Sequence, residues 1–192
     1  MNMKVIYIIC IFLISSFFAA QEKCETFESA SLHIKKVDKN DLICIAKNSD
    51  QPITVFYTFA SWCQPCRMHL LQALYLEKYY KSNVYILLVE GESDPRIING
   101  INYIKKYAPD GKMVVLKDDI YEGGVKKRNR KFVKEITPAQ FENIDDFSKF
   151  IIMNKEGETL LVTTYKDSEN DPDWTDAMPM IKRKVIPLLE KR

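Results

Sequence analysis

Cys63 and Cys66 are the two residues of this chain whose type and spacing could do chemistry. They end the stretch Phe56–Cys66, which reads FYTFASWCQPC. Residues 53–59 are apolar, aromatic or β-branched and predict a buried strand, whereas leucine and alanine recur at helical spacing within residues 67–80. The two cysteines are therefore expected in the first turn of a helix that follows a core strand.

The first turn of a helix favours a thiolate over a thiol, because its backbone N–H groups are unpaired and the positive end of the helix macrodipole lies there. A cysteine with a pKa of about 8.5 is about 3% thiolate at pH 7, whereas one with a pKa of about 7 is about half ionised. Pro65 suits a helix start, where its missing N–H costs nothing. The spacing predicts thiol-disulfide exchange, in which Cys63 attacks a disulfide and Cys66 resolves the mixed disulfide.

Two other readings of a C-x-x-C pair are a structural disulfide and half of a zinc site. The sequence contains no second C-x-x-C pair and no H-x-H cluster that would complete four zinc ligands. Neither a metal nor a cofactor is therefore expected.

The residues Trp62 to Arg67, W-C-Q-P-C-R, follow a strand that ends in F-x-x-F-A. This combination resembles the thioredoxin family, and more narrowly the TlpA-like thiol-disulfide oxidoreductases of the bacterial envelope. The resemblance implies an α/β thioredoxin-like fold over residues 31–192, with a central mixed sheet flanked by helices and an inserted strand-helix segment. It also implies redox-active Cys63 and Cys66 supported by Trp62 and Pro65, disulfide-containing substrate proteins, and a membrane thiol donor.

The sequence departs from the family pattern where a cis-proline usually precedes the hairpin and packs against the two sulfurs. That place falls near residues 147–149, none of which is proline. Pro138 is expected to reach the site from its earlier position, with Ser148 as the alternative.

A second departure lies six residues before Cys63, where many thioredoxins bury an acid. The residue here is Tyr57, whose pKa of about 10 makes it a poor base near neutral pH. Removal of the proton from Cys66 would then pass to water or to Glu90, at the end of the next predicted strand. His69 is expected to be an exposed imidazole.

The remaining patterns predict the elements that position these residues. Strands are expected over residues 31–37, 84–89 and 113–116, and a hairpin over residues 150–165 with its turn at 154–157. Helices are expected from a cap at Asn40 or Asp41 to Ser49, over 97–107, and over 174–190, where Pro179 and Pro187 must kink or shorten the helix. The basic run 126–131 predicts a solvated helix face, since acidic residues follow it directly.

Length and composition predict one domain with a proper core, because the chain has 192 residues of which 46% are hydrophobic. Residues 1–20 have the pattern of a signal peptide and residues 21–30 form a polar lead-in, so a periplasmic or otherwise exported protein is expected. Phe18 is poorly suited to cleavage after Ala20, and an uncleaved N-terminal anchor stays open as the one contact with a membrane. Its apolar run of about 15 residues is short for a span of about 20.

The formal net charge of +2 falls by one when Lys4 is removed with the leader, and near-neutrality argues against nucleic-acid binding. Four cysteines then remain, an even count that permits two disulfides. A bridge between Cys24 and Cys44 would contribute about 3 kcal/mol by the chain-entropy estimate. The alternative to this bridge is a buried Cys44 and a free Cys24 thiol.

The alternative to a thiol-disulfide oxidoreductase is a non-catalytic binding or chaperone-like module that keeps the fold.

Overall fold

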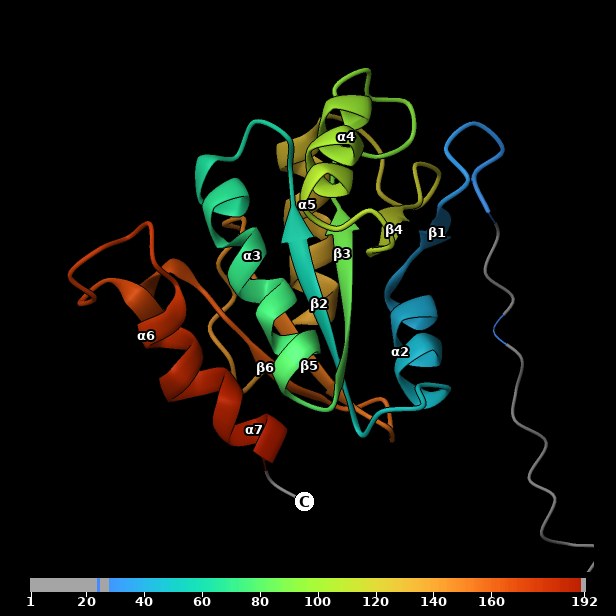
Figure 1. Cartoon of the computed structure of the whole chain (residues 1–192). Helices are drawn as coiled ribbons and strands as arrows, with labels where there is room; N and C mark the ends of the chain where they lie inside the picture. Colours follow the sequence, from blue (N-terminus) through green and yellow to red (C-terminus); the bar gives the residue numbers. More distant parts are fainter. Residues whose placement is uncertain (1–23, 25–27, 191–192) are drawn as a thin grey trace, which may run out of the picture.

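The computed structural model describes Cys24 and residues 28–190 (Figure 1). The signal peptide expected over residues 1–20 and most of the expected lead-in lie outside the described residues. Within the described part of the chain, no helix combines the length and the apolar character needed to cross a bilayer.

A six-stranded mixed sheet in the order β1-β4-β3-β2-β5-β6 forms the centre of the molecule. Neighbouring strands from β1 to β2 pair in parallel, whereas β5 pairs antiparallel with both β2 and β6. All seven residues of β2 are buried, as expected for a strand covered on both faces. The strands are β1 (Lys35–Val37), β2 (Ile53–Phe59), β3 (Ser82–Leu88), β4 (Lys112–Leu116), β5 (Phe150–Asn154) and β6 (Thr159–Val162).

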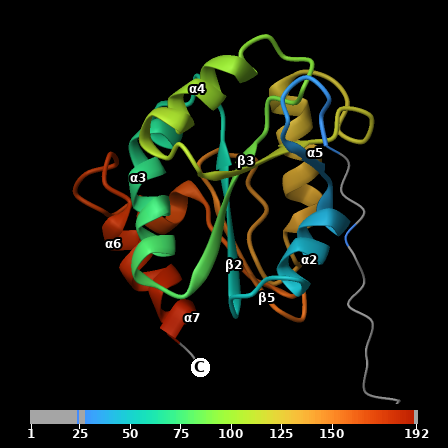
Figure 2. The same ribbon diagram turned by 45° about the vertical axis from the view of Figure 1, so that its right-hand side comes forward.

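Helices cover both faces of the sheet, and this is the thioredoxin-like fold that the sequence resemblance implies. Helices α3, α4, α6 and α7 lie on one face, and α2 and α5 lie on the other (Figure 2). The inserted segment is α4 followed by β4, which lies between β3 and the edge strand β1 and pairs in parallel with both. The helices are α2 (Lys39–Lys47), α3 (Gln64–Tyr79), α4 (Ile97–Tyr107), α5 (Val125–Ile136), α6 (Met178–Met180) and α7 (Ile186–Glu190).

Strand β2 and helix α4 have the bounds expected from the sequence, and the hairpin of β5 and β6 is present. The first strand is shorter than expected, because residues 30–32 form a turn and His33 has a positive φ of 53°. Helix α2 is capped by Asp38, which accepts the N–H groups of Asn40 and Asp41, and not by either of those two residues.

The last helix begins at Met178 and not at Trp174. Asp173 caps a turn by accepting from the N–H and hydroxyl of Thr175, and Pro179 lies in the first turn of α6, as its missing N–H favours. Pro187 lies within α7 and cannot donate to the carbonyl four residues earlier. The preceding residues Ile181–Val185 form a π-helical segment, in which the N–H of Ile186 bonds to the carbonyl of Ile181.

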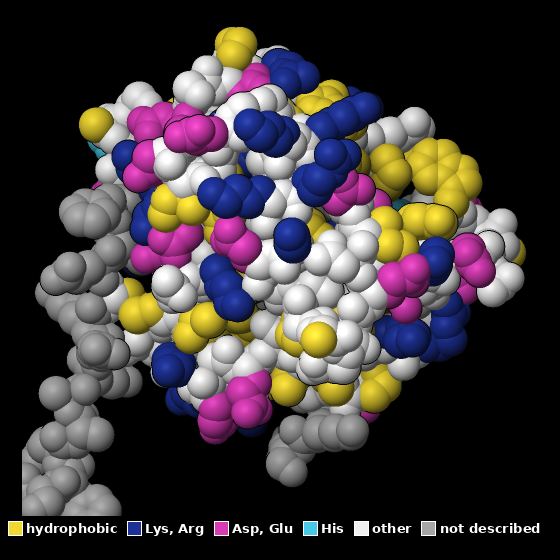
Figure 3. Space-filling model, turned by 180° about the vertical axis from the view of Figure 1, so that it is seen from behind, with side chains coloured by type: hydrophobic (Ala, Val, Ile, Leu, Met, Phe, Trp, Pro, Cys, Tyr) yellow, Lys and Arg dark blue, Asp and Glu magenta, His cyan; other side chains and the backbone are white. Residues whose placement is uncertain are grey.

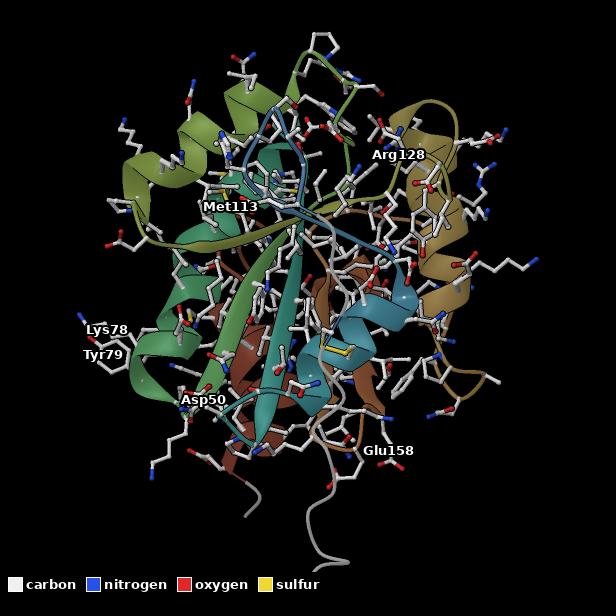
Figure 4. The ribbon with its side chains drawn as sticks, turned by 90° about the vertical axis from the view of Figure 1, so that its right-hand side faces the viewer. Asp50, Lys78, Tyr79, Met113, Arg128 and Glu158 are labelled. Atoms are coloured by element: carbon white, nitrogen blue, oxygen red, sulfur yellow. A yellow bond between two sulfur atoms is a disulfide. The ribbon has the colours of Figure 1, made fainter. Side chains whose placement is uncertain are left out.

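The basic run on α5 is only partly solvated. Seen from behind, the molecule shows basic and acidic side chains intermixed (Figure 3). Arg130 is exposed and pairs with Asp145 at 2.7 Å, as a solvated helix face requires. Arg128, however, is buried and pairs with Asp118 (Figure 4).

Candidate active site

Cys63 is the N-cap residue of α3. Its backbone is extended, and its sulfur accepts the N–H of Cys66 at 3.2 Å, the place that a serine or aspartate oxygen takes at ordinary helix starts. Pro65 lies in the first turn. The two cysteines form a disulfide with a Cα–Cα distance of 5.2 Å. Cys63 is 6% exposed and Cys66 fully buried, so an incoming disulfide meets Cys63 first.

The turn that leads into α3 is held by Glu90. Its Oε1 accepts the N–H of Ser61 at 2.6 Å and also the hydroxyl of Ser61. Glu90 is 1% exposed, and burial raises the pKa of its carboxyl, although the two hydrogen bonds from Ser61 oppose this. Its partners are groups of the turn and not the sulfur of Cys66, so the structure gives Glu90 a place in positioning the turn.

Tyr57 anchors the first turn of α3 from β2. Its hydroxyl donates to the carbonyl of Cys66 at 3.0 Å and shares a hydrogen bond of 2.7 Å with Ser148. Burial raises the pKa of Tyr57 far above its usual range, so the hydroxyl stays neutral. Tyr57 is therefore not able to act as a base near neutral pH, and its hydroxyl serves to hold the first turn of α3.

Ser148, and not Pro138, lies beside the cysteine pair. Ser148 has a positive φ of 65° and precedes the first strand of the hairpin. Pro138 immediately follows the end of α5, where a helix stops because proline disfavours helical geometry in the residue before it. It does not line the cavity at Cys63, and the described residues contain no cis peptide bond. This corrects the preference for Pro138, because of the two alternatives Ser148 is the one that lines the cavity with Cys63.

His69, which the sequence predicts to be exposed, is half-buried and lines the site beside Cys63. Its Nδ1 lies 3.0 Å from the Ser148 hydroxyl and its Nε2 lies 2.9 Å from the carbonyl of Trp174. Burial lowers the pKa of His69, while Asp176 and Asp173 oppose that shift. The sequence carried a signal for this position, because residues three apart on a helix share a face and Cys66 is buried.

A cavity of about 660 Å³ opens beside Cys63 between the start of α3, the segment before β5 and the segment before α6. Two of its lining residues, Trp62 and Phe147, pack edge to face with ring centroids 4.9 Å apart. Neither lysine nor arginine is among the described residues that line it. Its aromatic and acidic lining residues are Trp62, Phe147, Tyr165, Trp174, Asp146, Glu169 and Asp171.

A second disulfide joins Cys24 to Cys44 on the opposite side of the sheet. The Cα–Cα distance is 5.7 Å, and the bridge appears as a yellow bond beside α2 in Figure 4. Asn48, just after α2, places its amide nitrogen 3.2 Å from the sulfur of Cys24. Across the described residues, no group of three or more histidine, cysteine or acidic side chains is arranged to hold a metal ion.

No protein-family model matches this sequence, and no curated protein is significantly similar to it. Among solved structures, a thioredoxin-like protein from Aeropyrum pernix is 16% identical over 72% of this chain and 81% of its own, with a TM-score of 0.46. The thioredoxin domain of a thiol-disulfide oxidoreductase from Bacteroides vulgatus is 14% identical over 65% and 74%, with a TM-score of 0.42. Yeast Sco1 with copper bound is 16% identical over 80% and 87%, with a TM-score of 0.41. These values are too low to assign an activity, so the function has to come from the geometry around Cys63.

Proposed function

We propose that this chain is a thiol-disulfide oxidoreductase that reduces disulfides of other proteins. One observation carries the proposal. Cys63 occupies the N-cap of α3, where its sulfur already accepts a backbone N–H, bonds to Cys66 and borders a cavity. A sulfur in this place is stabilised as a thiolate when the disulfide opens.

The order of the two steps follows from the exposures of the cysteines, because Cys63 is accessible and Cys66 is buried. The Cys63 thiolate of the reduced chain attacks one sulfur of a substrate disulfide, a mixed disulfide forms, and the first substrate sulfur leaves as a thiolate. Cys66 then loses its proton and attacks Cys63, so that the second substrate sulfur leaves. Two electrons have passed to the substrate, and the Cys63–Cys66 disulfide has formed. Because Tyr57 is held neutral, water is the acceptor that we infer for the Cys66 proton.

The finer part of the proposal is a TlpA-like role in the bacterial envelope. The leader pattern of residues 1–20 supports export. The Cys24–Cys44 bridge fits an oxidising compartment, where structural disulfides persist. In that setting a membrane thiol donor would return Cys63–Cys66 to the dithiol after each turnover.

Insulin reduction with dithiothreitol as donor tests the activity. The wild-type chain should accelerate precipitation of the insulin B chain, and Cys63→Ser should reduce the rate to that of dithiothreitol alone. The matched control is the double variant Cys24→Ser/Cys44→Ser, which lacks the other disulfide and should keep the activity. A wild-type rate no higher than that of Cys63→Ser would refute the proposal.

A non-catalytic module that binds unfolded chains is the second candidate. The observation that favours it is the neutral, buried Tyr57 in the place of an acid. This candidate requires a Cys63–Cys66 disulfide that glutathione does not reduce, together with affinity for a reduced, unfolded polypeptide. Reduction by glutathione at millimolar concentration would eliminate it.

A further inference from the structure

Four hydrogen-bonding contacts run in one chain from the segment before α6 to the first turn of α3. They join the Trp174 carbonyl to His69 Nε2 at 2.9 Å and His69 Nδ1 to Ser148 Oγ at 3.0 Å. They continue from Ser148 Oγ to Tyr57 Oη at 2.7 Å and from Tyr57 Oη to the Cys66 carbonyl at 3.0 Å. The chain therefore links one wall of the cavity to the residue that resolves the mixed disulfide.

The number of hydrogens available to this chain depends on His69. Both ends are carbonyls, which only accept, and each hydroxyl supplies one hydrogen. A neutral imidazole supplies one more, which gives three hydrogens for four contacts. In either neutral tautomer, two acceptors must then face each other at one contact. An imidazolium supplies two hydrogens, and every contact is satisfied.

We propose that His69 is a positioning residue whose protonation completes this chain and so fixes the Trp174 wall of the cavity over the cysteine pair. The part of this inference that concerns substrate rests on the proposed function, because it takes the cavity as the substrate site. When His69 is neutral, one of the four contacts lacks a hydrogen in either tautomer, so the link between the Trp174 wall and the first turn of α3 is interrupted at that contact. The cavity is then less well ordered for an incoming polypeptide.

The charges around His69 determine the pH at which this happens. Burial lowers the pKa of His69 below its ordinary value of 6.5, and Asp176 and Asp173, from the segment before α6, oppose that shift. Tyr57 faces the chain from β2 and stays neutral. The cavity adds Asp146 near β5, which pairs with the buried Lys149, and Glu169 and Asp171 after β6. The chain is therefore completed on the acid side of pH 6.5.

An NMR titration of the oxidised protein tests the count of hydrogens without any substrate. The protein has two histidines, and in His33→Asn the only imidazole signals in the spectrum come from His69. His33 is exposed and has a φ of 53°, which asparagine tolerates. In this background Tyr57→Phe removes one hydroxyl, after which Ser148 can donate to neutral His69 and two hydrogens serve two contacts. We expect the pKa of His69 to fall by about 0.5 to 1, the effect of losing one hydrogen bond that favours the charged form.

The matched control is Tyr121→Phe, which removes another buried hydroxyl, one that donates to Glu135 on α5. It should leave the pKa of His69 unchanged. A His69 pKa that is unchanged or raised in Tyr57→Phe would overturn the inference. The titration does not depend on turnover, so a failure of insulin reduction with the expected fall in pKa would refute the proposed function alone.

The effect on substrate is measured as KM and kcat for insulin across the titration of His69. In the wild-type chain KM should rise about fivefold as His69 loses its proton, the effect of one hydrogen bond. His69→Gln cannot gain a proton and should have a KM that does not change with pH in this range. The same pH dependence of KM in both proteins would show that His69 does not control the wall.

Discussion

The two helices that carry the disulfides hold their cysteines at opposite ends. Cys63 and Cys66 lie at the N-terminal end of α3, where unpaired N–H groups and the helix macrodipole favour negative charge. Cys44 lies in the last turn of α2, where the carbonyl end of the helix disfavours a thiolate. The same covalent bond is therefore expected to be reactive at one site and structural at the other.

The two helices also differ in the groups that cap their first turns. Helix α2 begins with a capping box, in which Asp38 and Asp41 accept each other's backbone N–H groups and both pair with Lys117. Helix α3 has no acidic residue in its first turn, and its cap is the sulfur of Cys63. In α2 the backbone N–H groups of the first turn donate to carboxylates, whereas in α3 an N–H group of the first turn donates to the sulfur of Cys63. The turn before α3 is held from outside, by Glu90.

Trapping of a mixed disulfide is the largest effect expected from this comparison. Cys66→Ser leaves Cys63 without its resolving partner, so it should accumulate as a covalent complex with a disulfide substrate, and turnover should fall by about a hundredfold or more. Cys24→Ser leaves a free thiol on Cys44 at the helix end that disfavours a thiolate, and should trap little. Nonreducing gels and peptide mass mapping measure both. Equal trapping by the two thiols would remove the role given to the helix ends.

Loss of the second disulfide should act on stability alone. Cys24→Ser/Cys44→Ser opens a loop with a sequence separation of 20 residues and should lower the free energy of unfolding by about 3 kcal/mol. Insulin reduction should stay within about twofold of wild type, because the bridge lies across the sheet from the cavity. Urea denaturation measures the expected loss of stability, and the insulin assay measures the expected activity. An unchanged stability would show that the bridge constrains little of the unfolded chain.

Removing the hold on the turn before α3 should have the next largest effect. Ser61→Ala deletes the hydroxyl that donates to Glu90 and should destabilise the fold by about 1 to 2 kcal/mol when the carboxyl is ionised, because the lost hydrogen bond is then to a charged group. The folded-state pKa of Glu90 is raised, so this carboxyl favours folding less as pH rises from 4.5 through that value.

The pH dependence of the Ser61→Ala penalty distinguishes this cause from a general packing defect. Loss of the hydroxyl raises the pKa of Glu90 further, so the penalty should be smaller at pH 4.5, which lies below the raised pKa, than at pH 7. Urea denaturation at the two pH values measures it, with Ser93→Ala as a control, since Ser93 meets Asp118 through its backbone N–H. A penalty independent of pH would mean that Glu90 is not the group affected.

The reactive half of this comparison could be predicted from the sequence because it is local. The strand, the C-x-x-C pair and the helix follow one another within the chain, and hydrophobic periodicity gave β2 its bounds. The side chains that hold the first turn of α3 and line the cavity beside it could not be predicted in this way. Ser148 is 79 residues from His69 and 91 from Tyr57, so their contacts depend on how the segment before β5 returns to β2.

Pro138 shows why a short motif fails without its tertiary context. The dipeptide that suggested a cis-proline ends α5, whereas the chain then runs as an irregular segment to β5. That segment is held by the Asn129 amide, which donates to the carbonyl of Asp145 at 2.7 Å. No local pattern marks this contact. The buried position of Arg128 was missed for the same reason, because its partner Asp118 precedes α5 in another loop.

The smallest effect concerns the cap of α2. Asp38→Ala should cost about 1 kcal/mol, and Asp38→Asn only a few tenths, because asparagine also caps helices. Burial raises the pKa of Asp38, but hydrogen bonds from Lys117 and from the N–H groups of Asp41 and Asn40 lower it more, so the net pKa is below 3.8. Its stabilisation is therefore present above pH 3.8 and lost as pH falls through the folded-state pKa, and the Asp38→Ala penalty should shrink in acid. Neither variant should alter insulin reduction, because this cap supports the structural cysteine. A loss of activity in Asp38→Asn with unchanged stability would mean that the two helix starts are coupled through the sheet.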